Sequence, residues 1–194
     1  METIIHNIVE LLVNTVENSN YFVSIIMGML IIISESMIPI LPLALFIAIN
    51  ILVFGNVVGF FLSWIATTIG CSISFAIFRL LKKKMSGKLK QRPTLQKFMY
   101  KISKMKFSHL VILLSIPFTP AFSVNIGAGL SNMKYSKYLF ALLISKIFLV
   151  YFWGYIGTTF IESMTDIGVL FKLGTMLVIA FILSKLVMRK FDFE

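Results

Sequence analysis

One long segment of this chain, which we call the gap, contains no charged residue. No Asp, Glu, Lys or Arg occurs in the 43 residues from Ser36 to Phe78, and a lone carboxylate, Glu35, stands directly before them. A charged side chain at membrane depth costs roughly 2.5–3.5 kcal/mol even on a lenient insertion scale, so such groups are kept mainly for function. The gap predicts a membrane protein, and Glu35 is its first candidate functional residue.

Two prolines follow Glu35 closely, in the string SESMIPILP over residues 34–42. Proline removes a backbone donor and breaks a helix. Broken backbone at membrane depth is tolerated only where protein or a water-filled cavity satisfies it. Pro39 and Pro42 therefore predict an interrupted or re-entrant helix that lines a polar site.

Composition agrees with a membrane location. Hydrophobic residues make up 58% of the 194 residues and charged residues 13%, against about 25% charged in a typical soluble domain. We expect one integral-membrane domain over residues 1–194, without a metal or a cofactor. The single cysteine, Cys71, excludes an internal disulfide and a multi-cysteine metal site, and we expect it to be a buried small side chain.

The net charge of +10 is concentrated in one segment. Eleven Lys or Arg and no acidic residue lie between Arg79 and Lys106. A basic run can indicate nucleic-acid binding, but this one is flanked by membrane segments and follows the positive-inside bias of cytoplasmic loops. We therefore expect a cytoplasmic loop and no nucleic-acid partner.

Hydrophobic patterning divides the chain into helical segments. The positive residues lie on one side of this arrangement and the acidic turn at 162–166 on the other, so we expect a multi-pass protein of the cell membrane with a cytoplasmic C-terminus. The expected segments are an amphipathic helix at 3–17, a helix plus first re-entrant hairpin at 21–55, a transmembrane helix at 57–80, a basic loop at 81–106 with a short helix at 94–105, a second re-entrant hairpin at 107–133, and transmembrane helices at 138–161 and 167–187.

An internal repeat is visible in the prolines. Pro39-x-x-Pro42 and Pro117-x-x-Pro120 each follow an apolar run and precede a full span, and together they hold four of the five prolines. Under the expected threading the two elements enter from opposite faces, which is typical of inverted-repeat transporters. The alternative is that prolines recur by chance in membrane helices.

Several spaced positions carry a family resemblance. Between about residues 30 and 160, the chain resembles the DedA/VTT superfamily of "SNARE-associated Golgi protein"-type membrane domains. In the first half the resemblance rests on Glu35 before its proline pair, Phe54-Gly55-x-x-x-Gly59, Gly70, Phe75 and Arg79; in the second half it rests on Pro117-x-x-Pro120, Asn125, Gly129, Phe140 and Gly157.

This resemblance implies an all-α fold in which two re-entrant hairpins meet in mid-membrane. It implies lipid movement between leaflets by a flippase or scramblase, with undecaprenyl phosphate or a phospholipid as cargo. In the family, acidic and basic residues at mid-membrane are implicated in transport and ion coupling, and Glu35 matches the embedded carboxylate. With no ATP motif in the sequence, movement would be passive or driven by an ion gradient.

The chain departs from the family at three places. Leu43, Ala44 and Leu45 stand where many members carry an acidic residue after the first proline pair. Ser115 stands where many carry an arginine before the second pair, and Ser145 and Lys146 occupy a glycine region. These departures raise the hypothesis that Lys146 supplies the missing positive charge.

Each candidate site residue has a functional and a structural interpretation. Glu35 is a coupling carboxylate, a headgroup contact, or a carboxylate satisfied by nearby backbone. Lys146 either faces a cavity, where it can hold a phosphate, or extends to the interface. Ser115 and Asn125 are grouped with Lys146 as headgroup contacts, Pro39, Pro42, Pro117 and Pro120 as hairpin-shaping residues, and Gly55, Gly59 and Gly129 as packing glycines.

An enzyme is not expected, because the sequence holds no HExxH, GxSxG or Walker motif. The expected partners are membrane lipids, and a homo-oligomer stays open. The alternative function is a non-catalytic membrane adaptor or assembly factor for envelope homeostasis.

Overall fold

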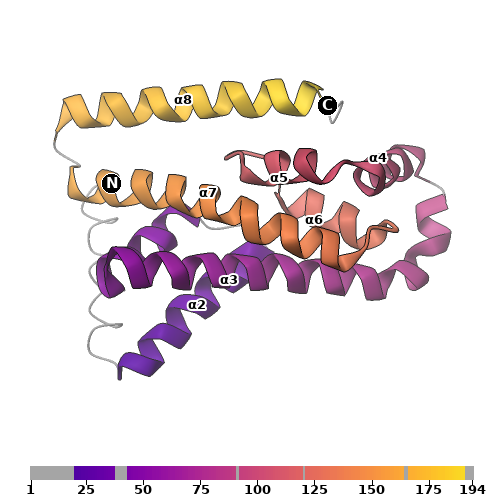
Figure 1. Cartoon of the computed structure of the whole chain (residues 1–194), viewed down its shortest axis with the longest axis horizontal. Helices are drawn as coiled ribbons and strands as arrows, with labels where there is room; N and C mark the ends of the chain where they lie inside the picture. The colour runs from indigo at the N-terminus through magenta and orange to yellow at the C-terminus, as the bar shows by residue number, and fades with distance from the viewer. Residues whose placement is uncertain (1–19, 38–42, 91, 120, 164–165, 191–194) are drawn as a thin grey trace.

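The computed structural model describes residues 20–37, 43–90, 92–119, 121–163 and 166–190. Within these ranges the chain is all-α, with seven helices and no strand (Figure 1). The expected amphipathic helix at 3–17, and the prolines Pro39, Pro42 and Pro120, lie outside the described residues. The helices are α2 (Tyr21–Met37), α3 (Leu43–Lys90), α4 (Pro93–Lys104), α5 (Phe107–Ser115), α6 (Ala121–Leu130), α7 (Tyr135–Glu162) and α8 (Ile167–Lys190).

A sharp bend at Gly55 divides α3 into a short arm (residues 43–54) and a long arm (residues 56–90). Gly55 has φ 80° and ψ 164°, a region of the backbone map that essentially only glycine occupies. Across the bend, the Asn50 amide donates a hydrogen bond to the Ser63 hydroxyl at 3.3 Å. A Cβ on Gly59 would lie 2.3 Å from the carbonyl oxygen of Asn50. The arms therefore fold back on each other, and the bend falls at the boundary between the segments expected at 21–55 and 57–80.

The short arm and α2 form an antiparallel pair, which we call the first unit. Tyr21 at the start of α2 contacts Phe54 at the end of the short arm, with ring centroids 6.0 Å apart. Further along, Gly28 lies against Asn50, and Ile32 and Ile47 share a buried cluster. The first unit therefore runs from the Gly55 end of the long arm toward its middle.

Helices α5 and α6 form the second unit, and the described residues 116–119 after α5 are not helical. Helix α5 contributes Leu110, Leu113 and Leu114 to a core cluster that also holds Ala141 and Leu142 of α7. Tight packing holds α6 against the long arm, because a Cβ on Gly129 would lie 2.6 Å from the carbonyl oxygen of Phe75.

Arg79 of the long arm fixes the C-terminal end of α6. Its Nε donates to the carbonyl of Gly129 at 2.7 Å, and its Nη2 donates to the carbonyls of Ala128 at 3.2 Å and Met133 at 2.7 Å. The last carbonyls of a helix have no partner within the helix and favour a positive charge. The second unit is thus attached near Arg79, far along the long arm from the Gly55 bend, as an inverted repeat predicts.

Helix α7 lies between α3 and α8 (Figure 1). By length and composition, three stretches within the described residues suffice to cross a membrane: Leu43–Lys82, Tyr135–Ile161 and Ile167–Arg189. The first of these contains the Gly55 bend. Large apolar side chains such as Phe171, Val178 and Leu186 of α8 are more than half exposed, which suits contact with lipid.

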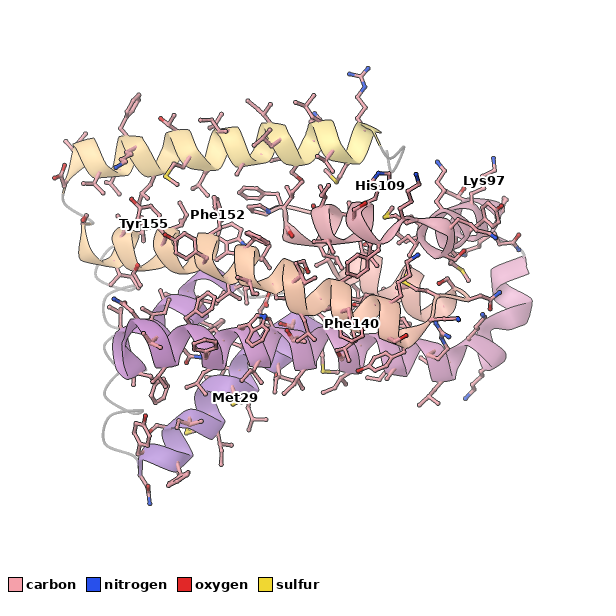
Figure 2. All side chains as sticks on the ribbon, viewed as in Figure 1. Met29, Lys97, His109, Phe140, Phe152 and Tyr155 are labelled. Atoms are coloured by element: carbon pink, nitrogen blue, oxygen red, sulfur yellow. The ribbon has the colours of Figure 1, made fainter. Side chains whose placement is uncertain are left out.

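The basic segment is more regular than the loop expected at 81–106. Helix α3 continues to Lys90. Helix α4 begins at Pro93, and proline is favoured in the first turn of a helix. The short helix expected at 94–105 is therefore present as α4. Lys97 of α4 lies at the end of the molecule where nitrogen-tipped side chains gather (Figure 2).

Candidate functional site

A cavity of about 410 Å³ lies between the C-terminal end of α2, the start of α3 and the residues that follow α5. Its volume falls within the range of about 300–1,000 Å³ that is typical of ligand sites. The first unit, the middle of the long arm, the second unit and α7 all contribute to its wall. The lining residues are Glu35, Ser36, Leu43, Ala44, Cys71, Leu114, Ile116, Phe118, Thr119, Ala121, Phe122, Ser123, Lys146, Leu149 and Trp153.

This central cavity holds two opposite charges. Glu35 lies in the last turn of α2 and is 8% exposed, while Lys146 lies midway along α7 and is 2% exposed. The two side chains interact electrostatically. Lys146 therefore faces the cavity and does not extend to the interface, which decides between the two interpretations that the sequence left open.

Burial makes this pair chemically consequential. A buried charge is costly unless a partner or a hydrogen bond compensates it. Most of the surrounding wall is apolar, with Leu114, Leu149 and Trp153 among the lining residues. Each charge is therefore the natural partner of the other, and an anion that enters the cavity would compete with Glu35 for Lys146.

The periodicity of α7 explains why these side chains share one wall. Lys146, Leu149 and Trp153 are separated by three and four residues, so they lie on one face of the helix. Leu142 and Val150, each four residues from Lys146, lie on the same side of the helix and pack into the core. The lysine is thereby held at the cavity by the burial of its own helix.

Phe118 marks strained backbone at the cavity edge. Its φ is 64°, and it is the one non-glycine residue with positive φ in the described ranges. Its ring contacts Trp153 of α7 and Phe181 of α8 edge-on, with centroids 5.4 Å and 5.8 Å apart. Such strain persists only where neighbouring contacts fix it, and it is concentrated at ligand clamps and switch regions.

Ser115 is placed beside the cavity but does not line it. Its neighbours Leu114 and Ile116 line the wall, while its own hydroxyl donates to the Val111 carbonyl at 2.7 Å. A hydroxyl bound to the carbonyl four residues earlier is satisfied within its helix. The structure therefore gives Ser115 a local role and brings only Glu35 and Lys146 together.

Asn125 belongs to a separate buried network. The Tyr138 hydroxyl donates to its Oδ1 atom, and the Tyr138 ring stacks on Phe75 with centroids 4.6 Å apart. The guanidinium of Arg79 lies over the Phe75 ring, with its Cζ atom 4.8 Å from the ring centroid. Asn125 is fully buried and is not among the residues that line the central cavity. In this structure it ties α6 to α7.

The three glycines expected to permit packing have different roles. Gly59 and Gly129 lie against backbone, where a Cβ would approach carbonyl oxygens at 2.3 and 2.6 Å. Gly55 has nothing within 4 Å of a Cβ position. Its role is conformational, because it supplies the positive φ of the bend.

Among the lining residues that sequence reasoning did not assign to the site are Cys71, Thr119 and Ser123. Cys71 is buried, as expected, but it also lines the cavity. Thr119 and Ser123 line it from the second unit. The position of Thr119 inside the second proline element was a usable signal, whereas Ser123 resembles any small polar residue of an apolar helix.

The fold and the cavity define a helical membrane protein in which two helical units and α7 enclose two buried residues of opposite charge, Glu35 and Lys146. The chain matches the profile of the VTT domain over residues 38–159. It belongs to this family, the DedA family.

Two proteins of Bacillus subtilis (strain 168) are similar to the chain. It is 33% identical to "Uncharacterized membrane protein YhjE" over 124 residues and 30% identical to "Uncharacterized protein YqeD" over 125 residues. These matches cover 63% and 64% of this chain, and the chain spans 60% of the length of each relative. No solved structure matches the chain.

Proposed function

We propose that this protein moves a phosphate-bearing lipid, such as undecaprenyl phosphate or a phospholipid, between the leaflets of the cell membrane. The observation that carries the proposal is the buried Lys146, which shares a cavity with Glu35 where two broken helical units meet. A lysine ammonium is a compact point charge that binds phosphate. A cation at this depth is costly, so it is retained for function.

We further propose that the first and second units are re-entrant hairpins that enter the bilayer from opposite sides. Their attachment near opposite ends of the long arm supports this arrangement. The basic segment, which includes α4, and the C-terminal end of α8 then lie on the cytoplasmic side, because Lys and Arg are enriched there. A headgroup then crosses only half of the membrane thickness to reach the central cavity from either side.

Lys146 takes the place of the arginine that the family resemblance implies near residue 115. Leu114 and Ile116, on either side of Ser115, line the same cavity as Lys146. A positive charge from α7 is therefore available beside the position where a charge from α5 is missing. The residue types differ, but the net charge offered to a headgroup is the same.

Glu35 is the proposed coupling or gating carboxylate. When a phosphate replaces it as the partner of Lys146, the carboxylate must find another partner or remain buried and uncompensated. A proton or a metal cation from an ion gradient supplies such a partner. This exchange requires no covalent chemistry, and we propose a transporter and not an enzyme.

Reconstitution tests the proposal directly. The full chain is placed in vesicles with fluorescent NBD-phosphatidylglycerol, and dithionite added outside bleaches the probe in the outer leaflet only. A transporter brings inner-leaflet probe to the surface, so bleaching exceeds the half observed in protein-free vesicles. A membrane adaptor, the alternative function, would leave the leaflet distribution unchanged.

A further inference from the structure

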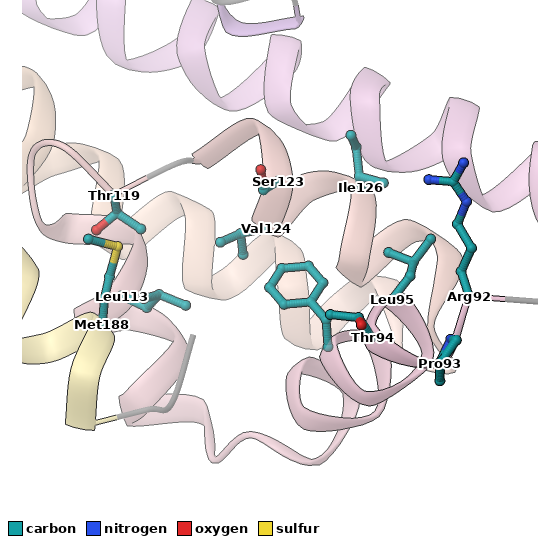
Figure 3. Close-up of a pocket in the computed structure, with 11 residues that line it drawn as sticks. Arg92, Pro93, Thr94, Leu95, Leu113, Thr119, Ser123, Val124, Ile126 and Met188 are labelled. Carbon is teal, nitrogen blue, oxygen red and sulfur yellow. The ribbon is translucent and has the colours of Figure 1, made fainter. Parts of the chain in front are cut away.

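A second cavity lies beside the central one, on the side of the basic segment. Its volume is about 780 Å³, and α4, α5, α6 and the C-terminal end of α8 contribute to it. Figure 3 shows Arg92 at one end of this cavity and Thr119 at the other. Thr119 and Ser123 line both cavities, so the two are neighbours across this pair of hydroxyls.

The wall of the second cavity combines one cation with an apolar surface. Arg92 supplies the charge, and the remaining surface includes Leu95, Phe98 and Ile126. A guanidinium binds phosphate through paired donors, and an apolar wall accepts a hydrocarbon chain. The chemistry fits a molecule with a phosphate at one end and a chain at the other.

The junction offers a hydroxyl that the described protein groups leave unused. The Thr119 hydroxyl is buried and has no hydrogen-bond partner within the described part of the chain. The Ser123 side chain is partly exposed where it lines both cavities. A hydroxyl donates one hydrogen bond and carries no charge, so it can satisfy a passing phosphate oxygen without holding the anion as firmly as a cation does.

We propose that the second cavity is a loading site for the lipid, in which Arg92 binds the phosphate and the Leu95–Phe98 wall takes the adjoining part of the chain. The headgroup then passes Ser123 and Thr119 to reach Lys146. This inference rests on the proposed function and adds the side of loading and the route. Arg92 and Lys146 are the two cationic ends of that route, and the hydroxyls lie between them.

A photo-crosslinking experiment tests the loading site. The full chain is reconstituted with phosphatidylglycerol that carries a diazirine in its acyl chain, and adducts are mapped by mass spectrometry in wild type, Arg92→Gln and Arg189→Gln. Arg189 is an exposed arginine of α8 that lines a different pocket, so it is the matched control. We expect adducts at residues 92–98 and 124–126 in wild type and Arg189→Gln, and about fivefold fewer in Arg92→Gln, the ratio that one basic contact to a phosphate provides.

Two results would overturn the loading site. One is an adduct yield at these residues that is equal in wild type and Arg92→Gln. The other is a loss of wild-type adducts, on adding inorganic phosphate at the lipid concentration, as large as the loss in Arg92→Gln. A site for free phosphate would not need the acyl chain of the lipid. Persistence of the adducts in inorganic phosphate supports a lipid site.

The route is tested by blocking the junction. Ser123→Trp is expected to slow the movement of NBD-phosphatidylglycerol by about tenfold or more, because the indole fills the space between the two cavities. Adducts at residues 92–98 are expected to remain. If Ser123→Trp does not fold, Arg92→Gln, which lies at an exposed position, takes its place. We expect Arg92→Gln to slow the movement of NBD-phosphatidylglycerol. Wild-type rates in a folded Ser123→Trp would overturn the route and leave the proposed function intact. An inactive wild type that still forms Arg92-dependent adducts would overturn lipid movement and retain the binding site.

Discussion

Glu35 and Lys146 line one cavity, although Glu35 ends α2 and Lys146 lies midway along α7. Helix α2 contains no basic residue, and the one acidic residue of α7, Glu162, lies sixteen residues along the chain from Lys146. The fold supplies that compensation by bringing the C-terminal end of α2 to the wall of α7 that carries Lys146. The charge pair is therefore a product of the tertiary fold, and its properties can be tested by changing each partner alone and both together.

A double-mutant cycle measures the coupling of this pair. Lys146→Met leaves the Glu35 carboxylate buried without its cation, and we expect a lower free energy of unfolding, because a buried charge without a partner is costly. Glu35→Gln combined with Lys146→Met removes both charges and should recover most of that loss. Unfolding in detergent micelles, followed by circular dichroism, checks this. Strictly additive losses would show that the two residues do not interact.

Glu35→Gln separates coupling from headgroup binding. The substitution keeps the size of the side chain but removes its charge and its exchangeable proton. We expect phosphatidylglycerol movement to continue and to lose its dependence on an imposed proton or sodium gradient. The measurement compares dithionite bleaching with and without each gradient. A gradient dependence equal to that of wild type would remove Glu35 from the coupling step.

Gly55→Ala tests the bend between the arms of α3. Because φ is 80° at this position, an added Cβ strains the backbone, and we expect a loss of about 1–3 kcal/mol in the free energy of unfolding. Gly174→Ala in α8 is the matched control, because nothing lies within 4 Å of its Cβ position and its φ is not positive. The control should be neutral or stabilising. Thermal unfolding of both variants checks this, and equal melting temperatures would contradict the account of the bend.

Tyr138→Phe tests the structural role of Asn125. The variant removes the hydroxyl that donates to Asn125 Oδ1 and leaves a buried acceptor unpaired, which costs about 1–3 kcal/mol. We expect lower stability and an unchanged rate of lipid movement per folded molecule. Slower movement at unchanged stability would instead return Asn125 to the headgroup contacts.

The sequence predicted the elements that interrupt an otherwise apolar pattern. Glu35 and Lys146 stand out because any ionisable group in such a pattern is costly, and the proline pairs stand out because they break helices. The boundary between the segments expected at 21–55 and 57–80 was visible in the sequence, although the single residue that makes the bend, Gly55, was assigned to packing. A periodicity argument cannot distinguish a glycine required for its φ from one required for its small size.

Other parts of the site depend on tertiary contacts that leave no local signal. Ser115 and Ser123 are both small polar residues in apolar helices, yet Ser115 is bound to its own helix and Ser123 lines two cavities. Asn125 was grouped with the headgroup contacts because it lies among glycines, but its partner Tyr138 comes from the next helix. The expected basic loop is largely helical because α3 continues to Lys90, and lysine is itself a good helix former.

The most direct test of the central claim is the rate at which NBD-phosphatidylglycerol changes leaflet in vesicles that contain wild type, Lys146→Met, Lys146→Arg or Lys172→Met. Lys172 is an exposed lysine of α8 and serves as the control. If the buried cation of the central cavity binds the headgroup, Lys146→Met slows movement by roughly 10- to 100-fold, the ratio that one hydrogen bond to a charged group provides, while Lys146→Arg retains part of the rate and Lys172→Met all of it. Movement by folded Lys146→Met at the wild-type rate would contradict the account.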